Sequence, residues 1–154
     1  MPAVDDRSQE LVERLFDAFN RRDAAAIVGL CDERMEFFAV TADEAGRSNP
    51  YVGKEGLSSY LDDVARIWEE LLITPTQVEQ QGDSLLVSGR VYLRSRALGI
   101  RDMPAAWIWD LREGLFMRGR VFVDPEDAVR SFSRAARPGQ SPDLRASRST
   151  TRLR

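Results

Sequence analysis

The chain is predicted to have an α+β fold, in which helices cover one face of a mostly antiparallel sheet. Three observations support this prediction. Apolar residues in the first half recur at helical spacing, whereas those after Pro75 alternate with a period of two. Turn sequences at Gly82-Asp83 and Glu113-Gly114 join consecutive strands. Helices followed by a run of neighbouring strands are typical of the α+β class.

Two helices are expected near the start of the chain. The first buries Leu15 and Phe19 on one face and has Asp6 as its expected N-cap. A short second helix follows over residues 24–30, with Asp23 at its N-cap position.

A strand, a loop and a third helix are expected next. Residues 35–41 alternate as in a strand, and residues 42–50 contain the Gly, Ser, Asn and Pro of a mobile loop. The third helix is predicted to begin near Lys54 and to continue to Leu71, because apolar residues keep helical spacing up to that point. Its charged residues, including Asp63, are expected to face water.

The second half is predicted to form a four-stranded meander and a last helix. The strands cover residues 76–81, 85–97, 105–112 and 115–123. Asp124 and Pro125 then supply the N-cap and the first residue of a helix that continues through Phe132.

The composition excludes several kinds of chemistry. The chain contains no histidine, which excludes imidazole-dependent nucleophiles and most catalytic zinc sites. Its one cysteine, Cys31, ends a helical apolar segment and is expected to be a buried packing residue. We therefore predict neither a metal nor a cofactor.

Targeting signals are not expected. The N-terminus has acidic residues where a secretory signal would have basic and apolar ones, and no segment approaches the ~20 apolar residues of a membrane span. The sequence therefore predicts a cytoplasmic protein that does not associate with a membrane.

The charge distribution predicts one domain and a tail. Residues 1–136 have a net charge of −7, whereas residues 137–154 have a net charge of +4. The second segment contains Pro, Gly, Ser and Thr but no aromatic residue, so we expect a disordered basic tail. With no aromatic side chain to stack on bases, it is expected to be a solvated end rather than a nucleic-acid-binding segment.

Six short segments resemble, in order and at similar spacing, the pattern of bacterial SnoaL-like proteins of the nuclear transport factor 2-like superfamily. They are FNRRD at 19–23, DERMEF at 32–37, YVGKEG at 51–56, QGD at 81–83, WDLREG at 109–114 and RGRVFVDPEDA at 118–128. The resemblance covers about residues 8–132. It implies a cone-shaped α+β barrel, in which a strongly curved sheet wraps around three helices and encloses a pocket, with a C-terminal helix outside.

Alternation along the strands and the helix faces predicts which residues line this pocket. They are Leu15, Phe19, Phe37, Ala39, Tyr60, Val91, Met103, Trp107, Trp109, Met117 and Val121. Tyr60 is either a hydrogen-bond donor to a ligand oxygen or a packing residue. Trp107 and Trp109 are large enough to fill much of the space, although Gly89 and Gly119 argue that room remains.

The catalytic pattern of related enzymes is absent. The superfamily that the chain resembles includes ketosteroid isomerases and polyketide cyclases, which move protons with inward carboxylates and a hydrogen-bond donor. The positions that match the isomerase tyrosine and its two aspartates are Leu15, Ala39 and Trp107, which are all apolar. Asp124 remains a weak candidate for a general base, in competition with its N-cap role.

Three hypotheses about function remain open. The first is a binder of a small apolar or aromatic molecule. The second is a proton-transfer enzyme of the polyketide cyclase or isomerase type, and the third is a structural dimerisation module. A homodimer through the outer sheet face is expected in any case, because that face is rich in arginine and aromatic residues. These residues include Arg90, Tyr92, Arg94, Arg118, Arg120 and Phe122.

Overall fold

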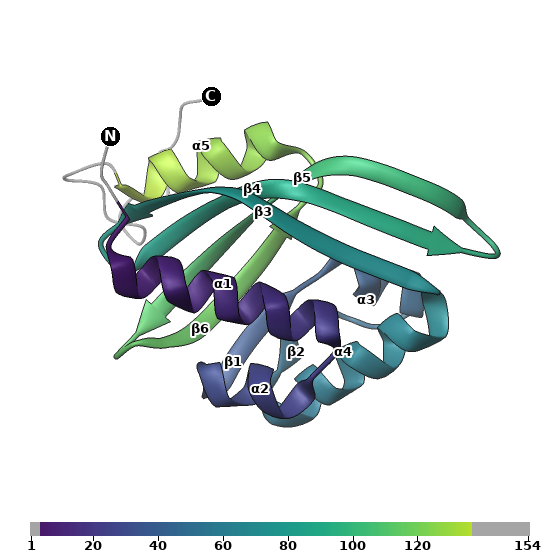
Figure 1. Cartoon of the computed structure of the whole chain (residues 1–154). Helices are drawn as coiled ribbons and strands as arrows, with labels where there is room; N and C mark the ends of the chain where they lie inside the picture. Colours follow the sequence, from purple (N-terminus) through teal and green to yellow (C-terminus); the bar gives the residue numbers. More distant parts are fainter. Residues whose placement is uncertain (1–3, 137–154) are drawn as a thin grey trace.

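A computed structural model describes residues 4–136, and within that range six strands form one curved sheet (Figure 1). The strands are β1 (Cys31–Phe38), β2 (Tyr51–Val52), β3 (Glu70–Gln81), β4 (Ser84–Ser95), β5 (Gly99–Arg112) and β6 (Leu115–Phe122), in the spatial order β2-β1-β6-β5-β4-β3. Neighbouring strands are antiparallel except β1 and β6, which are parallel. The predicted α+β class and mostly antiparallel sheet are confirmed. The predicted basic tail, residues 137–154, lies outside the described residues.

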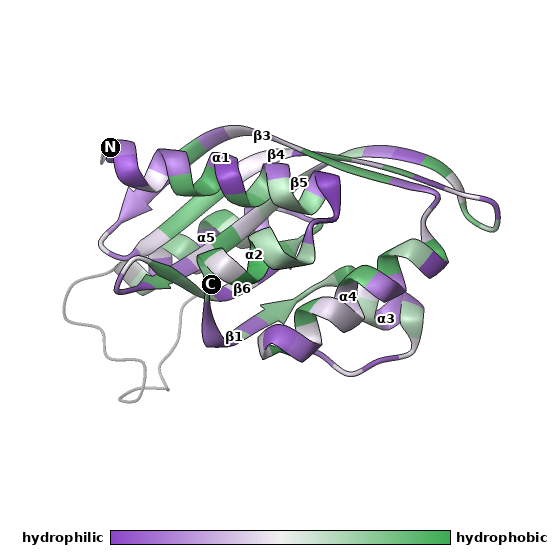
Figure 2. Cartoon of the chain, turned by 60° about the horizontal axis from the view of Figure 1, so that its bottom comes forward, coloured by the Kyte–Doolittle hydropathy of each residue, from purple (hydrophilic) through white to green (hydrophobic). Residues whose placement is uncertain are grey.

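Helices flank both faces of this sheet. They are α1 (Asp6–Arg21), α2 (Ala24–Leu30), α3 (Val40–Ala45), α4 (Gly53–Ile67) and α5 (Pro125–Ala136). In Figure 1, α1 lies on one side of the sheet and α5 on the other. Apolar and polar residues alternate around α1 and α4 in Figure 2, which is the pattern of helices that bury one face.

The caps of the first two helices follow from local side-chain hydrogen bonds. The N-cap of α1 is Asp5 rather than the predicted Asp6, and its carboxylate accepts a 2.7 Å hydrogen bond from the Ser8 N–H. Asp23 caps α2 as predicted, by accepting a 3.1 Å hydrogen bond from the Ala26 N–H.

The segment predicted as a loop at residues 42–50 begins with a helix. The strand before it ends at Phe38, and α3 follows from Val40, so the predicted strand was too long at its end. The Asn49 side chain then bonds to both the N–H and the carbonyl oxygen of Ala39, at 3.0 and 3.2 Å. These two hydrogen bonds hold the end of the segment next to Ala39, the residue that follows β1.

The boundary between α4 and β3 differs most from the prediction. The helix ends at Ile67, and β3 begins at Glu70, so Leu71 lies in a strand rather than in a helix. Pro75 lies inside β3, where the register with β4 shifts. A proline is tolerated there because β3 is an edge strand, and the bulge relieves the ladder. Gly89 on β4 makes room for this bulge, since a Cβ would lie only 2.2 Å from the Thr74 carbonyl oxygen.

The outer face of the sheet is partly covered. α5 packs against it and forms a second, smaller apolar cluster, which contains Leu86, Ala106, Ile108, Ala128 and Phe132, with Phe122 against it. Phe122, which was predicted to belong to a dimer interface on this face, is therefore partly buried within the chain itself. The larger cluster lies on the inner face, between the sheet and helices α1, α2 and α4. None of the helices in residues 4–136 has the length and apolar character needed to cross a membrane.

Candidate functional site

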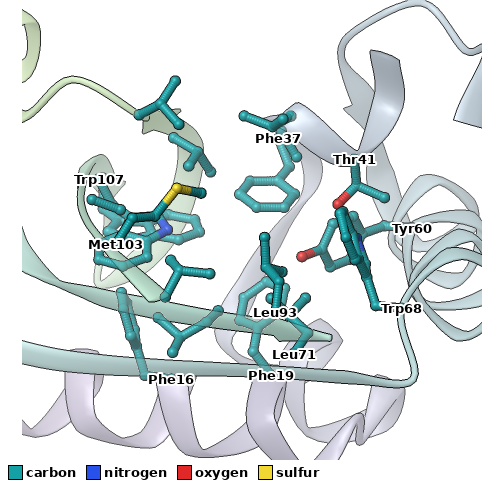
Figure 3. A pocket seen from close by; sticks show the side chains of 18 residues that line it. Phe16, Phe19, Phe37, Thr41, Tyr60, Trp68, Leu71, Leu93, Met103 and Trp107 are labelled. Carbon is teal, nitrogen blue, oxygen red and sulfur yellow. The ribbon is translucent and has the colours of Figure 1, made fainter. Parts of the chain in front are cut away.

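A cavity of about 70 Å³ lies between the inner face of the sheet and the helices α1 and α4 (Figure 3). Nine of the eleven predicted lining residues reach it. They are Phe19, Phe37, Ala39, Tyr60, Val91, Met103, Trp107, Trp109 and Val121. Leu15 and Met117 do not line it. Leu15 is fully buried elsewhere in the core, because Phe16 and Phe19 occupy the cavity side of α1.

A β-bulge accounts for the position of Met117. Arg118 on β6 pairs with Asp110, but the next pair joins Phe116 to Leu111, which leaves Met117 as an extra residue. The bulge reverses the alternation of faces beyond it. Phe116 therefore takes the inward position and is fully buried, whereas Met117 is only half-buried.

Nine further residues line the cavity. They are Phe16, Val40, Thr41, Trp68, Leu71, Ile73, Leu93, Ala105 and Val123. Thr41, Leu93, Ala105 and Val123 among them follow from the predicted strand alternation, and the other five do not. Leu71 and Ile73 were missed because the predicted helix continued to Leu71 and the next predicted strand began only at residue 76, whereas β3 begins at Glu70. Their two-residue spacing was the signal that could have placed them on the inner face of a strand.

Aromatic rings form most of the wall. The Trp109 indole stacks on Phe37, with 5.6 Å between ring centroids and 8° between planes, and Phe16 meets Trp107 edge-on at 4.9 Å. Trp109 also lies directly against the Gly119 backbone, where a Cβ would come within 2.1 Å of its Cζ3 atom. The space opened by Gly119 is therefore filled by Trp109, contrary to the expectation that it leaves room for a ligand.

Hydroxyl groups enter the lining at two positions. Tyr60 projects from α4 with its hydroxyl directed into the cavity, and Thr41 on α3 lies beside it (Figure 3). Burial raises the pKa of Tyr60 well above its usual range, and the Thr41 side chain opposes this shift only in part. Tyr60 is therefore a protonated donor at neutral pH. The buried Nε1 atoms of Trp68 and Trp109 have no hydrogen-bond partner among residues 4–136.

No carboxylate, lysine or arginine occurs among the described residues that line the cavity. Asp124 is exposed and lies outside the lining, and its carboxylate accepts a 3.0 Å hydrogen bond from the Glu126 N–H at the start of α5. This is the N-cap role expected of an aspartate before Pro125. Ala39 and Trp107, at two of the isomerase acid positions, are buried apolar residues of the wall.

Cys31 and metal ligands contribute nothing to the cavity. Cys31 is the first residue of β1, and burial raises the pKa of its thiol to about 12, so the reactive thiolate is scarce at neutral pH. Within residues 4–136, no group of three or more His, Cys, Asp or Glu side chains is arranged to hold a metal ion.

Two residues of the lining, at the start of α3 and just after β6, are exposed to solvent. These residues, Val40 and Val123, are 39% and 54% exposed, so they lie where the cavity meets solvent. The mouth of the cavity is therefore apolar.

A buried carboxylate anchors the wall around Tyr60. The side chain of Asp63 is only 1% exposed, contrary to the prediction that it faces water. It accepts hydrogen bonds from the Tyr51 hydroxyl at 2.8 Å, from Arg66 at 2.9 Å and from Arg47. Burial alone would raise the pKa of Asp63, but these bonds outweigh it and hold the pKa below its ordinary value. The Tyr51 ring in turn packs edge-on against Tyr60 at 5.3 Å.

Comparison with known proteins places this geometry in a family context. The sequence profile of the SnoaL-like domain matches residues 12–119. No curated protein matches the chain in sequence.

Solved structures with a similar fold share little sequence identity. An NTF2-like protein of unknown function from Burkholderia pseudomallei K96243 is 14% identical, with a TM-score of 0.70, over 82% of this chain and 97% of that one. TerC, solved with polyporic acid, is 18% identical, with a TM-score of 0.70, over 84% and 97% of the two chains. A candidate SnoaL-like polyketide cyclase from Shewanella denitrificans OS-217 is 16% identical, with a TM-score of 0.63, over 82% and 99%. At these identities the likeness is one of fold.

Proposed function

The chain belongs to the SnoaL-like domain family, and we propose that it binds a small, flat, uncharged apolar molecule in its cavity, without acid–base chemistry of its own. One observation carries the proposal: among the described residues that line this aromatic and aliphatic cavity, the protonated Tyr60 is the one ionisable group. Apolar pockets with a few placed polar groups are typical sites for such ligands.

The size of the cavity limits how a ligand can be held. At about 70 Å³ it is smaller than the roughly 150 Å³ engineered cavity that takes up benzene in another protein. A ligand of one or two rings must therefore extend into the mouth between Val40 and Val123. The exposed apolar surface of these two residues supports that placement.

A proton-transfer enzyme is the second candidate, because two structural neighbours are described as candidate polyketide cyclases and TerC was co-crystallised with polyporic acid. Such a reaction needs a group that can accept a proton near neutral pH. Asp124 caps α5 outside the cavity, and Tyr60 holds its proton too firmly to act as a base. The wall therefore favours binding over proton transfer.

Filling the cavity tests the proposal. Ala39→Leu places a larger side chain in the lining, so it should abolish the quenching of tryptophan fluorescence by naphthalene. If the space is truly empty, the unfolding free energy should change little, whereas overpacking a filled core would cost about 1–3 kcal/mol. Fluorescence titration and urea denaturation measure the two effects.

Val52→Leu is the matched control, because Val52 is exposed and lies outside the lining. It should leave both measurements unchanged. A strongly destabilised Ala39→Leu protein, together with a wild type that does not respond to naphthalene, would support a purely structural module instead. Steady-state turnover that is lost in Asp124→Asn would support the enzyme.

A further inference from the structure

We propose that the bound molecule carries a neutral hydrogen-bond acceptor of the carbonyl type, and that the Tyr60 hydroxyl recognises it. This inference rests on the proposed ligand-binding function and goes further, because it assigns the polar chemistry of the ligand. The inference rests on one arrangement: the Tyr60 hydroxyl has a fixed direction, and the described residues of the cavity wall around it carry no charge.

The Tyr60 ring is held in place from three sides. Phe37, Tyr51 and Phe19 pack edge-on against it, with ring centroids 5.0, 5.3 and 5.7 Å away. The side chain is only 4% exposed. Because the ring cannot swing, the hydroxyl keeps its direction into the cavity (Figure 3). A donor fixed before binding loses little conformational entropy when a ligand arrives.

The two buried tyrosines of this cluster use their hydroxyl groups differently. The Tyr51 hydroxyl donates to the Asp63 carboxylate at 2.8 Å, so its donor is already used. Within residues 4–136, the Tyr60 hydroxyl donates to no carboxylate and to no backbone carbonyl; its polar neighbour is the Thr41 hydroxyl, which is itself able to donate to the tyrosine oxygen. The O–H of Tyr60 is thus free for a ligand atom.

The wall also decides which ligand atom suits this donor. A carboxylate would lose its hydration without gaining a cationic partner, since the described lining has no lysine or arginine. A plain hydrocarbon would leave the buried hydroxyl without its hydrogen bond. An uncharged carbonyl oxygen accepts one hydrogen bond and brings no charge into the cavity. Ketones, aldehydes and quinone-like rings therefore fit this site best.

Three probes of nearly the same shape test the inference on the whole chain. Acetophenone has a carbonyl oxygen, α-methylstyrene has a CH₂ group in its place, and benzoate is charged. Titration calorimetry should show that acetophenone binds roughly three- to tenfold more tightly than α-methylstyrene, the effect expected for one net hydrogen bond. Benzoate should bind more weakly than either.

Variants assign the difference to one hydroxyl group. Tyr60→Phe should equalise the affinities for acetophenone and α-methylstyrene. Tyr92→Phe, on the outer face of β4 and outside the lining, should keep the ratio of the wild type. The carbonyl stretching frequency of ¹³C-labelled acetophenone should shift down on binding to the wild type and to Tyr92→Phe, but not on binding to Tyr60→Phe.

The outcomes separate the two proposals. Equal affinities of the wild type for the ketone and the hydrocarbon would overturn this inference and leave the proposed function standing. Tightest binding of benzoate would also overturn it. If neither neutral probe binds, the proposed function and this inference both fail. The wild-type ratio decides the matter even if Tyr60→Phe does not fold.

Discussion

At the residue scale, Asp63 joins α4 to the segment that precedes this helix. It is a buried carboxylate on α4, and the groups that bond to it come from Arg47 and Tyr51, which precede the helix, and from Arg66 within it. A buried charge is costly unless hydrogen bonds satisfy it, and here donors surround it. The position of the α3 segment at the cavity mouth therefore depends on one ionised group.

The pH dependence of stability should reveal this group. The folded-state pKa of Asp63 lies below its unfolded value, so its contribution is present at neutral pH and is lost as the pH falls below about 5 and through the folded pKa. Asp63→Asn should lower the unfolding free energy by about 1–3 kcal/mol at pH 7, because three donors lose a charged acceptor. The loss should be smaller at pH 3.

Asp62→Asn is the matched control, since Asp62 is the exposed neighbour on the same helix. Urea denaturation at both pH values should give it nearly the stability of the wild type. A loss for Asp63→Asn of the same size at pH 3 and pH 7 would contradict the ionised anchor.

At the element scale, the contact between β5 and β6 depends on one glycine. Trp109 occupies the place of a side chain at Gly119, so the two strands fit together only if position 119 has no Cβ. Gly119→Ala should lower the unfolding free energy by about 1–3 kcal/mol through overpacking. Because a displaced indole would move toward the cavity, the same substitution should also weaken naphthalene binding.

Gly29→Ala provides the comparison. Gly29 is exposed on α2, and a Cβ there would meet no atom within 4 Å. Alanine should raise the unfolding free energy by about 0.5–1 kcal/mol, because glycine is a poor helix former. If thermal and urea denaturation place both alanine variants on the same side of the wild type, the steric argument at Gly119 is wrong.

The sequence predicted those elements whose periodicity does not depend on distant contacts. The amphipathic α1, the meander and the helix after Asp124 follow from spacing, turns and caps, which are local. The start of β3 could not be predicted in this way. Trp68 and Leu71 keep the spacing of a helix, whereas Leu71 and Ile73 have the spacing of a strand, and pairing with β4 decides between the two.

The residues of the candidate site divide in the same way, into those predictable from local alternation and those that depend on distant contacts. The inward residues of β4 and β5 were predicted because strand alternation is unbroken there, as at Val91 and Trp107. Phe116 rather than Met117 faces inward because of a β-bulge, and such a bulge is visible only in the pairing of β5 with β6. The buried state of Asp63 depends on Arg47, from a segment that was predicted to be a loop.

At the scale of the whole molecule, part of the outer face remains uncovered by α5. Leu72 on β3 is 45% exposed, and Ile100 on β5 is 65% exposed. Tyr92, on the strand between them, pairs with Leu72. The nearby Arg94 is already paired with Glu69 and Glu70 of the same chain. We propose that the expected homodimer uses this apolar strip, with the arginines as a charged rim, rather than ion pairs between two chains.

Ile100→Glu should therefore shift the protein from dimer to monomer in light scattering, because it places a charge in the apolar strip. The melting temperature of the monomer should change little, since Ile100 is largely exposed. Val52→Glu, at the opposite edge of the sheet, should leave the mass unchanged. A wild type that is monomeric at millimolar concentration would refute the dimer.

The parallel pairing of β1 with β6 has a consequence for the order in which the chain can fold. Glu36 and Arg118, partners in this pairing, are 82 positions apart. While a ribosome makes the chain, β1 therefore emerges long before the strand that completes its ladder. Its hydrogen-bonding edge and the aromatic side chains beside it must wait until β6 is synthesised, so nascent chains cut short before residue 115 should be clients of chaperones rather than folded intermediates.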